Sequence, residues 1–179
     1  MNPSQRHTRR GFTLVEAALT TTIVSLGVVA ILATQDAYQK KNNWAQRVST
    51  ALLLGNELRE LTMNMPLNDP ILGQATWGPE ENESSIEYFD DVDDFDGVDG
   101  EGMEFSPPIT ALREEIPDME QWTQRISVHN VNSDSIDGSA QDDNSTDMMR
   151  VTVEVFYQGP IDKERERVTR VQWITAGRP

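Results

Sequence analysis

The chain has 179 residues, which suits one globular domain with one additional element rather than two full domains. Asp and Glu number 30 against 15 Lys and Arg, so the formal net charge is -15. A surface this acidic repels phosphate groups, and no nucleic-acid partner is expected. The chain has no Cys and two His, which excludes a disulfide framework and thiol catalysis and disfavours histidine-based metal sites.

The first 33 residues join a short basic segment to a long apolar one. Residues 1–11 contain three Arg and no acidic residue, and residues 12–33 contain one charged residue, Glu16. As a helix, residues 12–33 span roughly 33 Å, enough to cross the apolar core of a bilayer. Their apolar side chains point to all sides of such a helix, which favours a membrane span over a buried core helix. Basic residues lie on both sides of the span, so charge alone does not orient it.

Glu16 is the candidate functional residue of the span. Placing a carboxylate in an apolar membrane segment costs free energy, so a residue of this kind usually has a function. The span itself contains no cation that could pair with Glu16. If the chain is cut after Gly11, Phe12 carries a free ammonium group four residues from Glu16, which is about one helical turn. The ammonium group of a neighbouring subunit serves equally well as a partner.

The sequence RGFTLVE from Arg10 to Glu16, followed by the apolar segment, resembles the class III signal of type IV pilins and pseudopilins. The resemblance implies that residues 1–11 are a leader peptide, which a prepilin peptidase removes by cutting after Gly11. It also implies that the same peptidase methylates the new amine of Phe12, and that Glu16 pairs with the amine of an adjacent subunit during filament assembly.

The helical pattern continues beyond the membrane segment, through residues 34–65. Apolar and small residues recur there every three or four positions: Trp44, Val48, Ala51, Gly55, Leu58, Thr62 and Met65. Pro66 ends the pattern. One helix over 12–65 is predicted, with a membrane-spanning first half and an amphipathic second half. Many pilins carry a proline near the end of the span; this chain has none between Pro3 and Pro66, which favours an unbroken helix.

The carboxyl-terminal segment 122–179 has the period of two that is typical of strands. The alternation is clearest from Met149 to Tyr157, and Trp122 to Val131 and Val168 to Thr175 are predicted as further strands. An antiparallel sheet of these strands, folded over the apolar face of the helix, gives an α+β two-layer, pilin-like fold.

The segment 66–121 is predicted to be loop-rich and acidic. Positions 80–104 contain twelve acidic residues and no Lys or Arg. An EF-hand loop requires D-x-D-x-D-G, but counting back from Gly97 places Val92 at the first ligand position, so that motif fails. One interpretation is a solvated acidic loop. The other is a Ca²⁺ site whose cation offsets the crowding of four candidate ligands: Asp91, Asp93, Asp94 and Asp96.

The sequence FDDVDDFDG from Phe89 to Gly97 also resembles a string in minor pilins of the mannose-sensitive haemagglutinin pilus group. Within it, Phe89, Val92 and Phe95 recur every three residues, a spacing that can anchor the segment in a core.

The resemblance to pilins implies a structural protein: a minor pilin or pseudopilin that is assembled with other subunits into a type IV pilus or a type II secretion pseudopilus. The implied location is the inner membrane, crossed once, with the soluble part outside the cytoplasm, and then the filament. The alternative is a binding module at a pilus tip, which a deep groove lined by aromatic residues favours. An enzyme is not expected, because the chain has no nucleophile elbow, P-loop or H-E-x-x-H motif.

Overall fold

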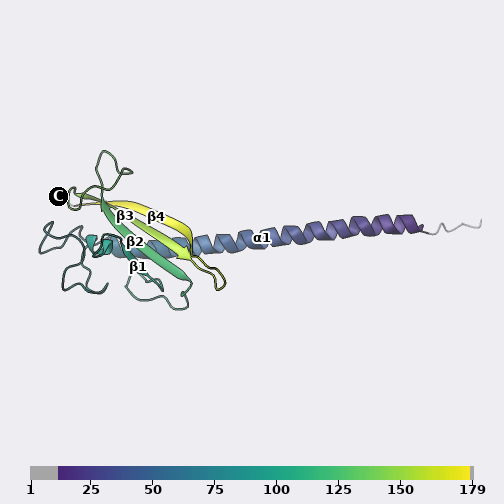
Figure 1. Cartoon of the computed structure of the whole chain (residues 1–179), viewed down its shortest axis with the longest axis horizontal. Coiled ribbons are helices and arrows are strands. Elements are labelled where there is room, and N and C mark those ends of the chain that lie inside the picture. The colour runs from purple at the N-terminus through teal and green to yellow at the C-terminus, as the bar shows by residue number, and fades with distance from the viewer. Residues whose placement is uncertain (1–11, 178–179) are drawn as a thin grey trace, which may run out of the picture. The chain divides into compact units, whose positions relative to one another are not determined.

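The computed structural model describes residues 12–177, which fall into two compact units divided between Ala45 and Gln46. The fold is α+β, as predicted: one long helix and a four-stranded antiparallel sheet (Figure 1). The elements in chain order are α1 (Leu14–Thr62), the short 3-10 helix η1 (Asp93–Asp96), β1 (Met103–Phe105), β2 (Trp122–Asn130), β3 (Met148–Tyr157) and β4 (Glu166–Ala176).

Helix α1 is shorter than predicted at both ends. It begins at Leu14, preceded by Thr13, whose hydroxyl accepts a hydrogen bond from the Glu16 backbone N–H. It ends at Thr62 because the chain turns there: the Thr62 hydroxyl donates back to the Leu58 carbonyl, and the Met65 N–H donates to the Thr62 carbonyl. Every residue of α1 up to Ala45 is exposed. By length and composition, α1 can cross a membrane.

The four strands form a meander in the order β1-β2-β3-β4, with every neighbouring pair antiparallel. Strand β1 was not predicted; it pairs Met103 with Ile126 of β2. Strand β2 alternates buried and half-buried residues along its whole length, which is the period of two seen in its sequence.

The last turns of α1 pack on one face of the sheet. The buried helix residues are Ala51, Leu54, Gly55, Leu58 and Thr62. At Gly55 the helix and β4 approach so closely that an added Cβ atom would lie 2.8 Å from Cγ2 of Val171. Trp44 is the first residue of the predicted apolar face, and it is 43% exposed. The part of this face that the sheet covers is therefore shorter than predicted.

Gln124 of β2 links three parts of this core. Its side chain is fully buried, donates a hydrogen bond of 2.7 Å to the Leu54 carbonyl of α1, and exchanges hydrogen bonds with both backbone groups of Ile109. All the polar atoms of this amide therefore have partners, which makes its burial tolerable. The loop before β2 is thereby fastened to both the helix and the sheet.

The acidic segment after α1 is anchored in the core as its spacing suggested. Phe89, Val92 and Phe95 are buried, and the rings of Phe89 and Phe95 meet edge to face with centroids 5.4 Å apart. The Val92 N–H donates to the carbonyl of Pro66, just beyond the end of α1. Because the apolar residues of this segment lie in the core, the aspartates between them are carried to the core as well.

Candidate functional site

The predicted assembly site lies at the start of α1. Gly11 and the rest of the predicted leader lie outside the described residues, and Phe12 is exposed. Thr13 is the N-cap: its hydroxyl accepts the Glu16 N–H at 3.2 Å, and its carbonyl accepts the Ala17 N–H. Thr13 and Glu16 thus have the spacing of a capping box, a signal that the sequence carries and that the prediction missed.

Glu16 lies in the first turn of α1 with an exposed side chain. The amino end of a helix carries a partial positive charge, which favours a carboxylate at this place. Exposed apolar residues surround it along the helix, including Leu14, Val15 and Leu19. The structure therefore presents an acidic group at the outer surface of an apolar helix.

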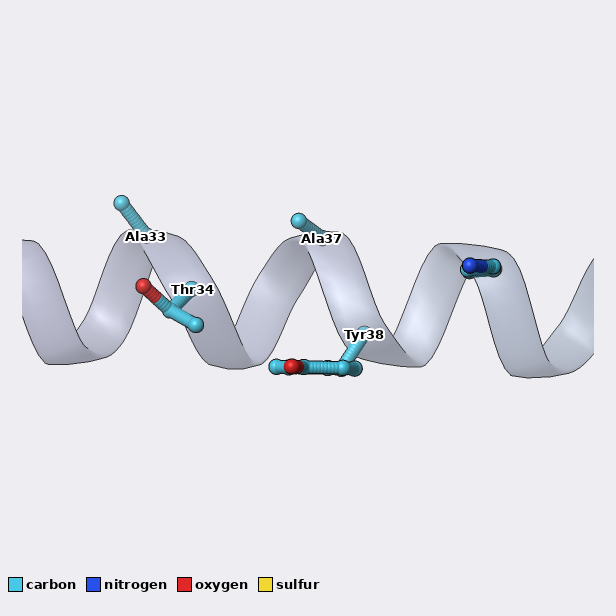
Figure 2. Close-up of a pocket in the computed structure, with 5 residues that line it drawn as sticks. Ala33, Thr34, Ala37 and Tyr38 are labelled. Atoms are coloured by element: carbon cyan, nitrogen blue, oxygen red, sulfur yellow. The ribbon is translucent and has the colours of Figure 1, made fainter.

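Two hollows lie elsewhere in the described residues. One is lined by five residues of α1 alone, so it is a surface groove along a single helix; Figure 2 shows Ala33 and Ala37, one turn apart, pointing to the same side. The other has a volume of about 780 Å³ and is lined by residues 63–68 and 174–177 together with Asp147. None of the residues that line this second hollow is aromatic. It is therefore unlike the deep, aromatic-lined groove that would favour a tip-binding module.

A group of acidic residues lies in the carboxyl-terminal unit, and we call it the acidic cluster. Its members are Asp69, Glu80, Glu83, Asp90, Asp91 and Asp94. They form three overlapping triplets, and within each triplet one carboxylate oxygen per residue lies within 4.8 Å of the others. Asp94 belongs to two of the triplets, one with Glu80 and Glu83 and one with Asp90 and Asp91.

Hydrogen bonds hold the cluster in place around Asp94, which is fully buried. Its Oδ2 accepts the backbone N–H groups of Asp90 and Asp91, at 3.0 and 3.3 Å. In return, Asp91 Oδ1 accepts the Asp94 N–H at 3.2 Å. Glu83 Oε2 accepts the Glu80 N–H at 3.2 Å. The loop backbone thus fixes the carboxylates near one another.

Two of the four predicted calcium ligands, Asp91 and Asp94, lie in the acidic cluster, and two do not. Asp93 Oδ2 accepts a hydrogen bond from the Asn68 amide. Asp96 accepts the indole N–H of Trp77 at 3.0 Å, and its other oxygen accepts the Val128 N–H. Asp96 therefore tethers η1 to β2. Asp69, Glu80, Glu83 and Asp90, which complete the cluster, were missed by the sequence prediction.

Burial changes the acid strength of these groups. It raises the pKa of Asp91 to about 9, with the neighbouring Asp93 adding to the effect, and it raises the pKa of Glu83 to about 8. The pKa values of Asp93 and Asp94 rise to about 6 for the same reason. Removing a carboxylate from water disfavours its charged form, and negative neighbours oppose ionisation further.

A pH dependence of stability follows for the protein without divalent cations. A raised pKa means that the folded state holds protons more tightly than the unfolded chain, whose Asp pKa is 3.8. Stability is then highest below about pH 4 for these groups and falls as pH rises through about 6, for Asp93 and Asp94, and about 9, for Asp91. In chelator, the melting temperature at pH 8 is expected to be lower than at pH 5 by about 5 °C or more. An equal or higher melting temperature at pH 8 would contradict the buried placement of these carboxylates.

Comparison with known proteins found no match: no family model, no curated protein and no solved structure matches the chain. The architecture itself is a long amino-terminal apolar helix with a small antiparallel sheet on its carboxyl-terminal turns, which is pilin-like. One candidate membrane-spanning helix near the amino terminus is consistent with single-pass anchoring.

Proposed function

We propose that the chain is a minor pilin or pseudopilin, a structural subunit rather than an enzyme. In this proposal a prepilin peptidase cuts after Gly11 and methylates Phe12. Before assembly, the subunit lies in the inner membrane with its carboxyl-terminal unit outside the cytoplasm. It then joins other subunits in a type IV pilus or a type II secretion pseudopilus. Within the family we place it near the D component of the mannose-sensitive haemagglutinin pilus, on the resemblance of the sequence from Phe89 to Gly97.

The observation that carries the proposal is the sequence RGFTLVE at the start of an exposed apolar helix. The helix begins at Leu14, so a cut after Gly11 leaves the new amine two residues before the first helical residue. Glu16 follows within the first turn. The apolar residues beyond it are exposed, as a helix that packs against lipid and against other subunits requires.

The larger hollow of the carboxyl-terminal unit does not by itself favour a tip-binding module. The hollow between the end of α1 and the end of β4 has no aromatic lining. A minor subunit needs a stable, soluble unit on a membrane helix, and the sheet packed on the last turns of α1 supplies it.

Leader processing tests the proposal. Gly11→Leu is expected to leave an unprocessed precursor in the membrane, because a peptidase that accepts a minimal residue before the cut excludes a large side chain by steric clash. Mass spectrometry of the purified chain distinguishes the precursor from a form that lacks residues 1–11 and carries one methyl group.

Gly27→Leu is the matched control for this experiment. It makes the same change within α1, at a position where an added Cβ meets no atom within 4 Å. It is expected to be processed like the wild type. A normal mature mass for Gly11→Leu, or a full-length wild-type chain in cells that contain the peptidase, would overturn the assignment.

A further inference from the structure

We propose that the acidic cluster binds Ca²⁺, through Asp94 and the carboxylates of Glu80, Glu83, Asp90 and Asp91 that surround it. Calcium takes six to eight oxygen ligands at 2.3–2.6 Å, so two oxygens on one ion are at most about 5 Å apart. Within each of the two triplets that contain Asp94, one carboxylate oxygen per residue lies within 4.8 Å of the other two. The side chains of each triplet are thus already spaced as ligands of a shared cation.

Asp94 provides an independent reason for a ligand at this place. Its side chain is 0% exposed, and its Oδ1 has no hydrogen-bond partner within the described residues, while Oδ2 has two. Glu80 shows the same asymmetry: Oε1 accepts the Thr76 hydroxyl, and the buried Oε2 has no partner there. A buried oxygen without a partner carries the full cost of its desolvation. These two residues share one triplet with Glu83, so the two oxygens that lack partners belong to side chains that converge on one place.

Within the described residues, no basic side chain forms an ion pair with this cluster; the charge of Arg113 acts on Asp90 without such a contact. No Lys or Arg lies between Arg59 and Arg113 in the sequence. The guanidinium of Arg113 donates to the backbone carbonyls of Glu87 and Phe89. None of the three ion pairs found in the described part of the chain includes a member of the cluster. Buried carboxylates are normally paired or bound to metal, so a cation from solution fits the charge that the chain leaves uncompensated.

The ligand chemistry favours calcium over magnesium. All the candidate ligands are carboxylates, which both ions accept. Magnesium demands a near-ideal octahedron and keeps several of its waters, whereas calcium accepts an irregular shell with many protein ligands. A crowded group of carboxylates, three of them buried and with two oxygens shielded from solvent, matches the second description.

Calcium would fasten the segment between α1 and the sheet. The triplet with Glu80 and Glu83 joins the loop around position 80 to Asp94 in η1, and Asp96 of η1 is already bonded to Val128 of β2. Folding of this loop then depends on the cation, which lowers the charge repulsion within it. The inference does not rest on the proposed function, because processing at Gly11 and cation binding involve different residues.

Thermal unfolding of the full chain in detergent tests the proposal. Addition of CaCl₂ to about 100 times the Kd is expected to raise the melting temperature by roughly 5–10 °C over chelator. NaCl of matched ionic strength is expected to have little effect, and MgCl₂ a smaller effect than CaCl₂. Asp94→Asn is expected to abolish the response to calcium. It should also raise the melting temperature in chelator above that of the wild type, since it removes a buried charge that has no counterion.

Asp99→Asn is the matched control within the same acidic segment. Asp99 is exposed and belongs to none of the triplets found in the described residues. Its variant is expected to respond to calcium as the wild type does. Equal loss of response in both variants would show that the effect is general charge screening and would overturn the site.

Direct binding keeps the proposal testable even if Asp94→Asn does not fold. Terbium replaces calcium and emits when a nearby indole is excited, and Trp77 lies beside η1 through its bond to Asp96. Terbium emission that CaCl₂ displaces is expected for the wild type and for Asp99→Asn, and its loss is expected for Glu83→Gln. Absence of both calcium-displaceable emission and a melting shift in the wild type would overturn the proposal.

Discussion

Replacing Glu16 by valine is expected to leave the subunit in the membrane and processed, but to remove it from the filament. A carboxylate costs about 2.5–3.5 kcal/mol to insert at the bilayer centre and less toward the end of the span, where Glu16 lies, so valine makes membrane insertion easier rather than harder. The cut after Gly11 precedes Glu16 by five residues, and it is expected to proceed normally. The defect should therefore appear only when subunits assemble.

The expected assembly defect is large because the ammonium group of Phe12 loses its negatively charged partner. In the proposed filament, the amine of Phe12 on one subunit pairs with Glu16 of its neighbour within an apolar bundle of helices. Removing one partner of a buried ion pair leaves the other charge unpaired, at a cost of about 3–5 kcal/mol. Recovery of Glu16→Val in sheared filaments is therefore expected to fall at least about 10-fold below the wild type.

Two control variants separate charge pairing from helix capping. The Glu16 N–H donates to the Thr13 hydroxyl, and a glutamine at position 16 also suits a capping box. Glu16→Gln thus keeps the cap and loses the charge, and it is expected to fail in assembly as Glu16→Val does. Thr13→Ala removes the cap, at a cost of about 1 kcal/mol, and is expected to assemble.

The measurement is the amount of each variant in sheared filaments relative to its amount in the membrane. Mass spectrometry of the membrane fraction shows whether each variant is cut. Wild-type recovery of Glu16→Val would contradict the assembly role, and normal assembly of Glu16→Gln alone would assign Glu16 to helix capping.

The main elements could be predicted because their signals are periodic and long. Apolar positions repeat along α1, and β3 alternates over ten residues. Strand β1 could not be predicted in the same way: it has three residues, too few to show a period, and exists only because Met103 pairs with Ile126 of β2. The ends of α1 were missed by a few residues because local hydrogen bonds of Thr13 and Thr62 decide them.

Only two of the six members of the acidic cluster were predicted, for a different reason. Asp91 and Asp94 are close in sequence, so their crowding could be recognised. Glu80 and Glu83 are brought to Asp94 by the fold of the loop, which has no periodic signal. Asp96 was predicted as a ligand from its neighbours, but its partners Trp77 and Val128 are 19 and 32 residues away in the chain. Contacts between residues so far apart in the chain depend on how the core packs, and sequence position alone does not reveal that packing.

Gly102→Ala is expected to cause the largest loss of stability of any single methyl group added to the carboxyl-terminal unit. Gly102 has a φ angle of +82°, in the region that favours glycine, and it lies directly before β1. A Cβ atom there would lie 2.2 Å from the carbonyl oxygen of Ile126 and 3.1 Å from Cβ of Ser127. Since the first of these atoms belongs to the backbone of β2, no side-chain rotation relieves the clash.

The strand itself must move for alanine to fit. Moving it weakens the pairing of Met103 with Ile126 and the hydrogen bond from the Gly102 N–H to the Asp96 carbonyl, which is 2.8 Å long. Strain at a left-handed position costs about 1–2 kcal/mol, and forced shifts in a packed region add about 1–3 kcal/mol. A total near 3–4 kcal/mol lowers the melting temperature by roughly 10 °C in a chain of this size.

Gly73→Ala is the matched control, because Gly73 has a φ angle of +62° and an added Cβ there would meet no atom within 4 Å. It is expected to lose only the backbone strain, about 1–2 kcal/mol or roughly 4 °C. Both variants are compared with the wild type by thermal unfolding of the full chain, followed by tryptophan fluorescence, to which the buried Trp122 contributes. If Gly102→Ala melts no lower than Gly73→Ala, then position 102 does not lie against the Ile126 carbonyl and β1 is not held on β2 as described. A clear gap between the two variants would measure the steric cost alone, since the strain of the left-handed backbone is common to both.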